Sequence, residues 1–363
     1  MDQQWKNRAA SAEAAIATRH LRRLWKVPGT QLGVVAWPPC AKDLTFATWH
    51  YWWQAHLLDT LVDAYVRDPK PDLVESIRKQ IRGHLTRNNG RWTNNYYDDM
   101  AWLALALERA GRLAGVPNPK ALATLADQLV NSWSPAEGGG IPWRKQDKFF
   151  NAPANGPAGI FLARYGNVSR ATEMADWIDA TLIDPETHLV FDGIKEGSLV
   201  RAQYTYCQGV VVGLETELAV RTGDSRHVAR VARLVEAIGA NIAPNGVLKG
   251  AGGGDGGLFA GITARYLALA ANELPDDGAT RSAARDIVLA SATAAWDNRA
   301  DVDGLPLFAA FWDRKAEVPG KSAESGGKVD GAVFESPSPE RDLSVQVSGW
   351  MLMEAANTVA ESS

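Results

Sequence analysis

The chain has 363 residues, 46% of them apolar and 22% charged, which is enough to bury one large core or two ordinary ones. Lys and Arg number 38 against 42 Asp and Glu, so the net charge is −4. This balance argues against a nucleic-acid-binding surface, which needs a basic excess. Fourteen tryptophans are many for this length, and flat rings of this kind suit the apolar faces of sugars.

Cys40 and Cys207 are the only cysteines, too few and too far apart for a disulfide framework or a metal site. We therefore expect no metal and no cofactor. Residues 1–8 lack the basic start and apolar core of a signal peptide, and no apolar run approaches the length of a membrane span. These features predict a cytoplasmic protein without a membrane span; a secreted protein whose leader is missing from this chain is the alternative.

Apolar residues recur at helical spacing along the whole chain, with almost no strand-like alternation. The helices that this spacing predicts cover about residues 8–25, 46–66, 71–88, 97–113, 119–133, 151–165, 168–182, 203–221, 224–240, 257–272, 278–296 and 342–360. They alternate between two classes. The first member of each pair has one charged face, whereas the second is nearly apolar all round.

The second helices of the six pairs start at a regular interval, which indicates repeated helical hairpins. They begin near residues 46, 97, 150, 203, 256 and 342. Such hairpins can stack as an open solenoid or close into a ring. Because a helix that is apolar all round must be buried on both sides, the two classes favour an inner and an outer ring. We predict an all-α fold, an (α/α)6 barrel, as a single domain over residues 1–363, with a mobile loop at 315–339.

In such a barrel, the segments that precede the inner helices all lie at one mouth. These segments are residues 46–53, 94–99, 138–155, 203–208, 250–257 and 341–346. They hold most of the unusual residues of the chain, while the turns at the opposite end are short. Functional loops usually gather at one end of a scaffold, so we expect the functional site at this mouth.

Asp98 and Asp99 stand among aromatic and amide residues, immediately before an apolar run. Paired acids beside aromatic rings are what glycoside cleavage requires. Acids at the start of a helix also serve as caps and suit the helix dipole, so both interpretations remain open here. A catalytic pair must reach the same groove, and adjacent helical residues point about 100° apart. We therefore expect the pair in the turn that enters the helix.

Aromatic and glycine-rich segments supply further candidates. Trp49, Trp52 and Trp53 share one helical face and suit either the core or a cleft. Trp143 follows three glycines and is a better cleft candidate. The glycine-rich run at 250–257 lacks the Lys-Ser/Thr of a phosphate loop. We expect its backbone to approach a sugar, with Asp255 either capping the next helix or bonding hydroxyl groups.

The six histidines are scattered along the chain. His50 and His56 are six residues apart, which is not a zinc spacing on one helix face. Sugar epimerases and isomerases on the same barrel use histidine as acid and base, and the mouth segments offer His50 and little else. This makes an epimerase a weaker alternative than a hydrolase.

Five motifs, in order along residues 46–360, resemble glycoside hydrolase family 76, the endo-α-1,6-mannanases. The motifs are Tyr97–Trp102, Gly138–Arg144, Asn151–Gly156, Tyr204–Gly209 and Gly256–Gly261. The resemblance implies an (α/α)6 barrel and a retaining mechanism on an α-mannan or manno-oligosaccharide. It also implies that Asp98 is the nucleophile and Asp99 the acid/base.

Eight residues of these segments are expected to bind substrate: Trp49, Asn95, Tyr97, Trp143, Asn151, Tyr206, Gln208 and Asp255. Cys207 and Pro142 depart from the family pattern near the expected groove and bear on subsite preference. A covalent intermediate intercepted by a sugar hydroxyl would give transglycosylation. The alternative from a different functional class is a barrel that binds glycans without cleaving them.

Overall fold

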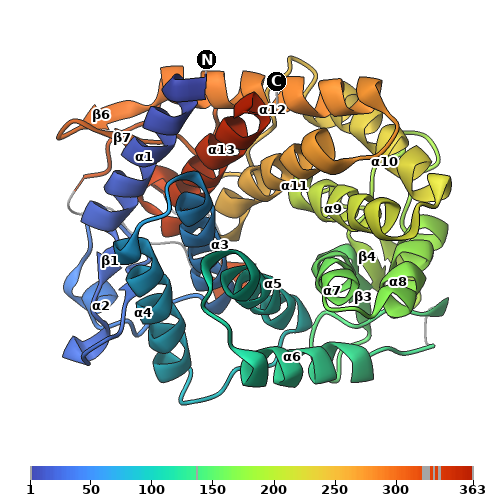
Figure 1. Ribbon diagram of the computed structural model, residues 1–363, viewed down its shortest axis with the longest axis horizontal. Coiled ribbons are helices and arrows are strands. Elements are labelled where there is room, and N and C mark those ends of the chain that lie inside the picture. The colour runs from blue at the N-terminus through green and yellow to red at the C-terminus, as the bar shows by residue number, and fades with distance from the viewer. Residues whose placement is uncertain (1, 136–137, 321–327, 330–331, 334–336, 362–363) are drawn as a thin grey trace.

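The computed structural model describes residues 2–135, 138–320, 328–329, 332–333 and 337–361. Twelve long helices in this part of the chain form two concentric rings (Figure 1). The inner ring consists of α3 (Tyr51–Arg67), α5 (Tyr97–Ala114), α7 (Ala152–Arg164), α9 (Thr205–Thr222), α11 (Phe259–Glu273) and α13 (Leu343–Glu361). The outer ring consists of α1 (Asp2–Arg19), α4 (Pro71–Arg87), α6 (Pro119–Asn131), α8 (Val168–Thr181), α10 (Ser225–Ala237) and α12 (Gly278–Asn298).

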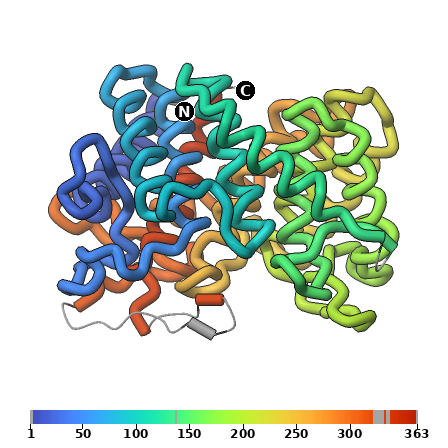
Figure 2. The backbone as a smooth tube through the Cα atoms, turned by 90° about the horizontal axis from the view of Figure 1, so that it is seen from below, coloured from blue at the N-terminus to red at the C-terminus, as the bar shows by residue number. Residues whose placement is uncertain are grey.

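Contacts between neighbouring inner helices close the ring. Each inner helix packs against the next, and α13 packs against α3. The outer helices pack on the inner ones, and α1 lies against α13, so the two chain ends lie near each other (Figures 1 and 2). The (α/α)6 barrel predicted by the two helix classes is confirmed, and the solenoid is excluded.

The inner helices are buried on all sides, as their composition predicts. In α9, every residue from Cys207 to Ala219 is buried. Glycine allows the close approach: a Cβ at Gly209 would lie 2.5 Å from Thr263 Cα, and one at Gly213 would lie 2.4 Å from the Tyr266 ring. Within the described ranges, no helix is long and apolar enough to cross a membrane.

The first helix ends earlier than its apolar spacing predicts. It stops at Arg19, because the buried His20 places its Nδ1 2.8 Å from the carbonyl oxygen of Val34. The chain then continues in β1 (Leu21–Arg22), which pairs with β2 (Leu32–Gly33) and is followed by a 3-10 turn, η1 (Leu24–Lys26). Tertiary contacts outweigh the local helical pattern here.

Short strands, which the sequence pattern did not reveal, complete the loops. They are β3 (Phe149–Asn151), β4 (Gly193–Lys195) and β5 (Ser198–Val200) in one antiparallel sheet, the hairpin β6 (Ala300–Val302) with β7 (Leu305–Leu307), and the hairpin β8 (Lys328–Val329) with β9 (Ala332–Val333). Smaller elements are α2 (Ala41–Leu44), the π-helix Ile238–Ile242, η4 (Gly254–Leu258) and η5 (Pro339–Arg341). Runs of two or three residues are too short for periodicity to detect. Much of the loop expected at 315–339 lies outside the described residues.

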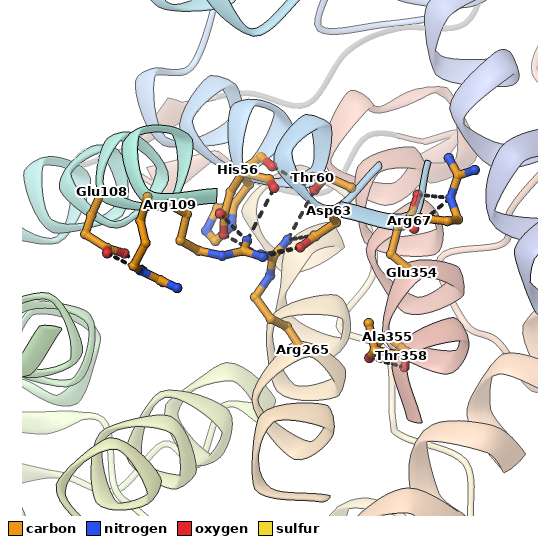
Figure 3. Close-up of polar contacts among 12 residues, drawn as sticks. His56, Thr60, Asp63, Arg67, Glu108, Arg109, Arg265, Glu354, Ala355 and Thr358 are labelled. Atoms are coloured by element: carbon orange, nitrogen blue, oxygen red, sulfur yellow. Dashed lines mark hydrogen bonds and ion pairs between the residues drawn. The ribbon is translucent and has the colours of Figure 1, made fainter. Parts of the chain in front are cut away.

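Charged side chains join the inner helices within the lumen of the ring (Figure 3). Arg109 of α5 and Arg265 of α11 both bind Asp59 and Asp63 of α3; Arg265 Nη2 lies 2.6 Å from Asp63 Oδ2. Because α11 is not a ring neighbour of α3, Arg265 reaches across the lumen. We call these four side chains the luminal ion network. They border a cavity of about 470 Å³.

Candidate active site

A cleft of about 700 Å³ opens at the end of the barrel where the inner helices begin. Five of the six predicted mouth segments contribute to its lining; the sixth, residues 341–346, does not. Asp342 of that segment lies behind the glycine-rich run, where its Oδ2 accepts the N–H of Gly254 at 2.7 Å. The clustering of unusual residues at one mouth is therefore confirmed.

Asp98 and Asp99 are the second and third residues of α5, and both line this cleft. The pair lies within the first helical turn rather than before it. Trp143 Nε1 donates to Asp98 Oδ2 at 2.9 Å, and the N–H of Asp99 donates to Asp98 Oδ1 at 2.9 Å. The amide of Asn94 donates to Asp99 Oδ2. Both carboxyls thus reach one groove, while their position also suits the helix dipole.

Burial raises the pKa of Asp98 to about 7. Loss of hydration disfavours the charged form and is the largest cause, and the charge of Asp255 adds to it. The hydrogen bonds from Trp143 and from the Asp99 N–H act in the opposite direction. Asp98 therefore changes charge near neutral pH, which is an unusual property for an aspartate and typical of a reactive site.

Asp255 is an acid with a fixed side chain on the wall of the cleft opposite Asp98 and Asp99. It lies in η4, and its Oδ1 accepts the indole N–H groups of Trp52 at 3.0 Å and Trp53 at 2.9 Å. Its Oδ2 accepts the N–H of Val333 at 2.7 Å. The side chain makes no helix cap, so of the two roles expected for it, capping is wrong and the position in the cleft suits hydroxyl binding.

Asp192 is a fourth cleft acid that sequence reasoning missed. It is 8% exposed and lines the cleft, and burial raises its pKa to about 7. Its backbone is fixed by hydrogen bonds with Ala152 N and Ala202 O. The residue lies just before β4, in the connection between α8 and α9 and outside the six mouth segments. The signal was an acid directly after the apolar run Leu189–Phe191.

Most of the expected substrate-binding residues meet in the cleft. Trp49, Trp143, Asn95, Asn151, Tyr206 and Asp255 all line it. Of the three tryptophans on one helical face, Trp52 also lines the cleft, whereas Trp53 is buried. Tyr97 packs against the core and is not part of the lining, so its neighbour Tyr96 takes the cleft position. Asn151 also caps α7, since its Oδ1 accepts the N–H of Ala154.

Gln208 does not face the cleft, which corrects its expected role. It is fully buried, and its amide makes hydrogen bonds with both the N–H and the C=O of Val190, at 2.7 and 2.9 Å.

Three other inner helices carry an amide at the same position as Gln208. The fourth residue of each helix binds both backbone polar groups of one residue outside the long helices: Gln54 with Gly33, Asn155 with Ile141, Gln208 with Val190, and Gln346 with Phe308. These four amide clamps hold connecting segments on the inner ring.

We expect Gln208→Leu to lower the free energy of unfolding by about 2 kcal/mol, because it leaves the buried N–H and C=O of Val190 without partners. Chemical denaturation with urea measures the change. Gln4→Ala, at an exposed glutamine of α1, is the control and should cost less than about 0.5 kcal/mol. Equal unfolding midpoints for Gln208→Leu and wild type would contradict the clamp.

Several glycines of the glycine-rich run pack against protein, and Asp255 is the residue of this run that lines the cleft, so a backbone approach to a sugar stays a prediction. A Cβ at Gly253 would lie 2.6 Å from Asp342 Oδ2, and one at Gly257 would lie 2.5 Å from Ser344 Oγ.

The three glycines at 138–140 all have positive φ. They let the chain turn against the Trp133 and Trp177 rings before it delivers Trp143 to the cleft.

His50 is the one histidine that lines the cleft. His56 and His84 are buried under it, and burial lowers the pKa of each to about 3. No group of three or more potential metal ligands occurs in the part of the chain that the structure describes. Cys207 is fully buried and does not line the cleft.

A closed (α/α)6 ring with aromatic rings and adjacent carboxyls at one mouth defines a carbohydrate-active barrel. The family model of glycosyl hydrolase family 76 matches residues 8–323. The chain belongs to this family and is a glycoside hydrolase, which confirms the resemblance seen in the motifs.

Solved structures agree with this assignment. The GH76A α-1,6-mannanase from Salegentibacter sp. HEL1_6 is 27% identical with a TM-score of 0.82, over 98% of this chain and 99% of that one. An inactive variant of that enzyme, with two adjacent aspartates changed to asparagine, is in complex with α-1,6-mannotriose. The Lin0763 protein from Listeria innocua is 25% identical with a TM-score of 0.80, over 97% of this chain and 96% of that one. No curated protein matches the chain.

Proposed function

We propose that the protein cleaves α-1,6-mannosidic linkages of a mannan or manno-oligosaccharide with retention of configuration. The observation that carries the proposal is the pair Asp98 and Asp99, which share one cleft lined by aromatic rings. The likeness to an α-1,6-mannanase whose adjacent aspartates are replaced in its inactive form supports the substrate class.

In the first step, the Asp98 carboxylate attacks the anomeric carbon of a mannosyl unit. Asp99 donates its proton to the departing glycosidic oxygen, so a covalent glycosyl-enzyme forms and the leaving sugar departs as an alcohol. In the second step, Asp99 takes a proton from water, and the hydroxyl attacks the same carbon and releases Asp98. A sugar hydroxyl in place of water gives transglycosylation.

The walls of the cleft fit a chain of sugars. The rings of Trp49, Trp143 and Tyr206 offer flat apolar surfaces to pyranose faces. Asp255 and Asp192 supply acceptors for hydroxyl groups. The hydrogen bond from Trp143 holds the Asp98 carboxyl and favours its charged form, which is the form that attacks.

Incubation with linear α-1,6-manno-oligosaccharides tests the proposal. Mass spectrometry should detect shorter products, and longer ones where transglycosylation occurs. Proton NMR at early times should show the α-anomer as the first product; the β-anomer would indicate inversion. Binding without any cleavage across substrates and pH would instead identify a glycan-binding barrel.

The pH dependence tests the role of Asp98. A nucleophile must be ionised, so kcat/KM should increase as the pH rises through about 7, the pKa of Asp98 in the free protein. Trp143→Phe removes a donor that lowers this pKa, so the acidic limb should move up by about one pH unit. Phe149→Leu, beside Trp143 in the same wall, is the control and should leave the limb in place. An acidic limb that stays in place in Trp143→Phe would show that the ionisation of Asp98 does not set it.

A further inference from the structure

Trp25 is the most exposed tryptophan of the described chain, with 51% of its area exposed. Its neighbour Leu24 is fully buried, so the chain turns sharply between the two side chains. An exposed indole loses contact with water when it stacks on an apolar face, which is a favourable step. About half of the Trp25 side chain is therefore open to contact with a ligand.

The Trp25 ring is held in place rather than free to rotate. Its Nε1 donates to the carbonyl oxygen of Thr45 at 2.7 Å. Its backbone has a left-handed conformation (φ 46°, ψ 28°), and Lys26 follows with φ 63°. Non-glycine residues rarely adopt this conformation, and it persists only where the surroundings impose it. A fixed ring loses little conformational entropy when it binds a ligand.

Trp25 lies next to the catalytic cleft, with one side chain between them. The guanidinium carbon of Arg87 is 5.7 Å from the centroid of the Trp25 ring and 5.2 Å from that of Trp49. Arg87 and Trp49 both line the cleft. Arg87 is itself fixed, because its Nε and Nη2 donate to the carbonyl oxygens of Phe46 and Ala47 at 2.7 and 3.0 Å. The residues Trp49, Arg87 and Trp25 form a continuous strip from the cleft to the surface.

We propose that this strip is a remote sugar subsite, in which Trp25 stacks against a mannosyl unit of a chain that leaves the cleft over Arg87. A chain that occupies the cleft can continue along the strip, where it meets a cation and then a flat ring. Hydroxyl groups can accept hydrogen bonds from a guanidinium, and the C–H face of a pyranose fits an indole. The inference rests on the proposed function and extends it: the protein acts better on long chains than on short ones.

The test compares kcat/KM for α-1,6-manno-oligosaccharides of three to eight units. Trp25→Ala should leave the shortest substrate unaffected and lower kcat/KM on the longest by about three- to tenfold, mainly through KM. Trp25→Phe, which keeps a ring, should lie between Trp25→Ala and wild type. Tyr165→Ala, at an exposed aromatic residue after α7, is the control and should show no dependence on length.

The possible outcomes separate the inference from the function on which it rests. If wild type cleaves no substrate, the proposed function fails. If wild type cleaves but Trp25→Ala has the same effect at every length, or none, the subsite is wrong. Calorimetry supplies a readout without turnover: in an Asp98→Asn background, Trp25→Ala should weaken binding of the octasaccharide and leave that of the trisaccharide unchanged.

Discussion

Replacing Asp98 by asparagine is expected to lower kcat by at least about 10⁴-fold, because the amide cannot form the glycosyl-enzyme. Asp99→Asn should lower kcat by about 10²- to 10⁴-fold on a natural substrate, since the leaving oxygen then departs without a proton. Assays on α-1,6-manno-oligosaccharides measure both. The two amide variants keep the size of the side chain, so thermal unfolding should show that they remain folded.

An added nucleophile distinguishes the two roles. In Asp98→Ala, azide can occupy the space of the lost carboxylate and attack once, which gives a β-mannosyl azide. In Asp99→Ala, azide replaces water in the second step, and two inversions give the α-azide. A mannosyl donor with a good leaving group should restore the first step in Asp99→Ala but not in Asp98→Ala, because such a group needs no acid.

Asp127→Asn is the control for these variants, since Asp127 lies exposed on α6 and bonds only Asn131 among the residues described. It should retain full activity. Undiminished turnover in Asp98→Asn or in Asp99→Asn would overturn the assignment of that residue. The β-azide from Asp99→Ala and the α-azide from Asp98→Ala would exchange the two roles.

Arg265→Met is expected to lower the free energy of unfolding by about 3 kcal/mol. Removal of Arg265 leaves two largely buried carboxylates, Asp59 and Asp63, with Arg109 as their one remaining partner in the network, and removing one partner of a buried pair typically costs about 3–5 kcal/mol. The lower end of this range applies, because these side chains are still 10–16% exposed to solvent: Asp59, Asp63, Arg109 and Arg265. The loss also removes the link between α11 and α3 across the lumen.

Urea denaturation measures this effect, and two comparisons make it specific. Arg226→Met removes two ion pairs, with Asp176 and Asp224, in which Arg226 is 51% exposed, and it should cost less than about 1 kcal/mol. Adding Asp59→Asn to Arg265→Met restores the charge balance and should recover part of the loss. A cost for Arg265→Met no larger than that for Arg226→Met would show that the luminal ion network does not stabilise the ring.

Much of the fold follows from local pattern alone. The spacing of apolar residues placed the start of α5 at Tyr97 and that of α4 at Pro71, both as observed. The contrast between all-apolar and one-faced helices was enough to predict two rings, because an all-apolar helix needs partners on both sides. The same reasoning placed Asp98 and Asp99 at the mouth, since they come directly before such a helix.

Local pattern does not show which way an individual side chain turns. Tyr97 and Gln208 looked like cleft residues from their motifs, yet one packs on the core and the other holds Val190. The amides share the fourth position of four inner helices only when the helix starts are those of the structure, because the starts expected from the sequence differ by one to five residues. Their role appears only when each amide meets a residue 14 to 38 positions away.

The sequence by itself determined the helices, their two classes, and the position of the acid pair at the start of an inner helix, because these depend on neighbours within one or two turns. Closure of the ring decided much of the rest. It brings Asp192 and Asp255 into the cleft with Asp98 and sets Arg265 across the lumen against Asp59. Packing of the N-terminal segment on α4 leaves Trp25 one side chain away from Trp49. Such contacts join residues tens to hundreds of positions apart, and no local periodicity carries that information.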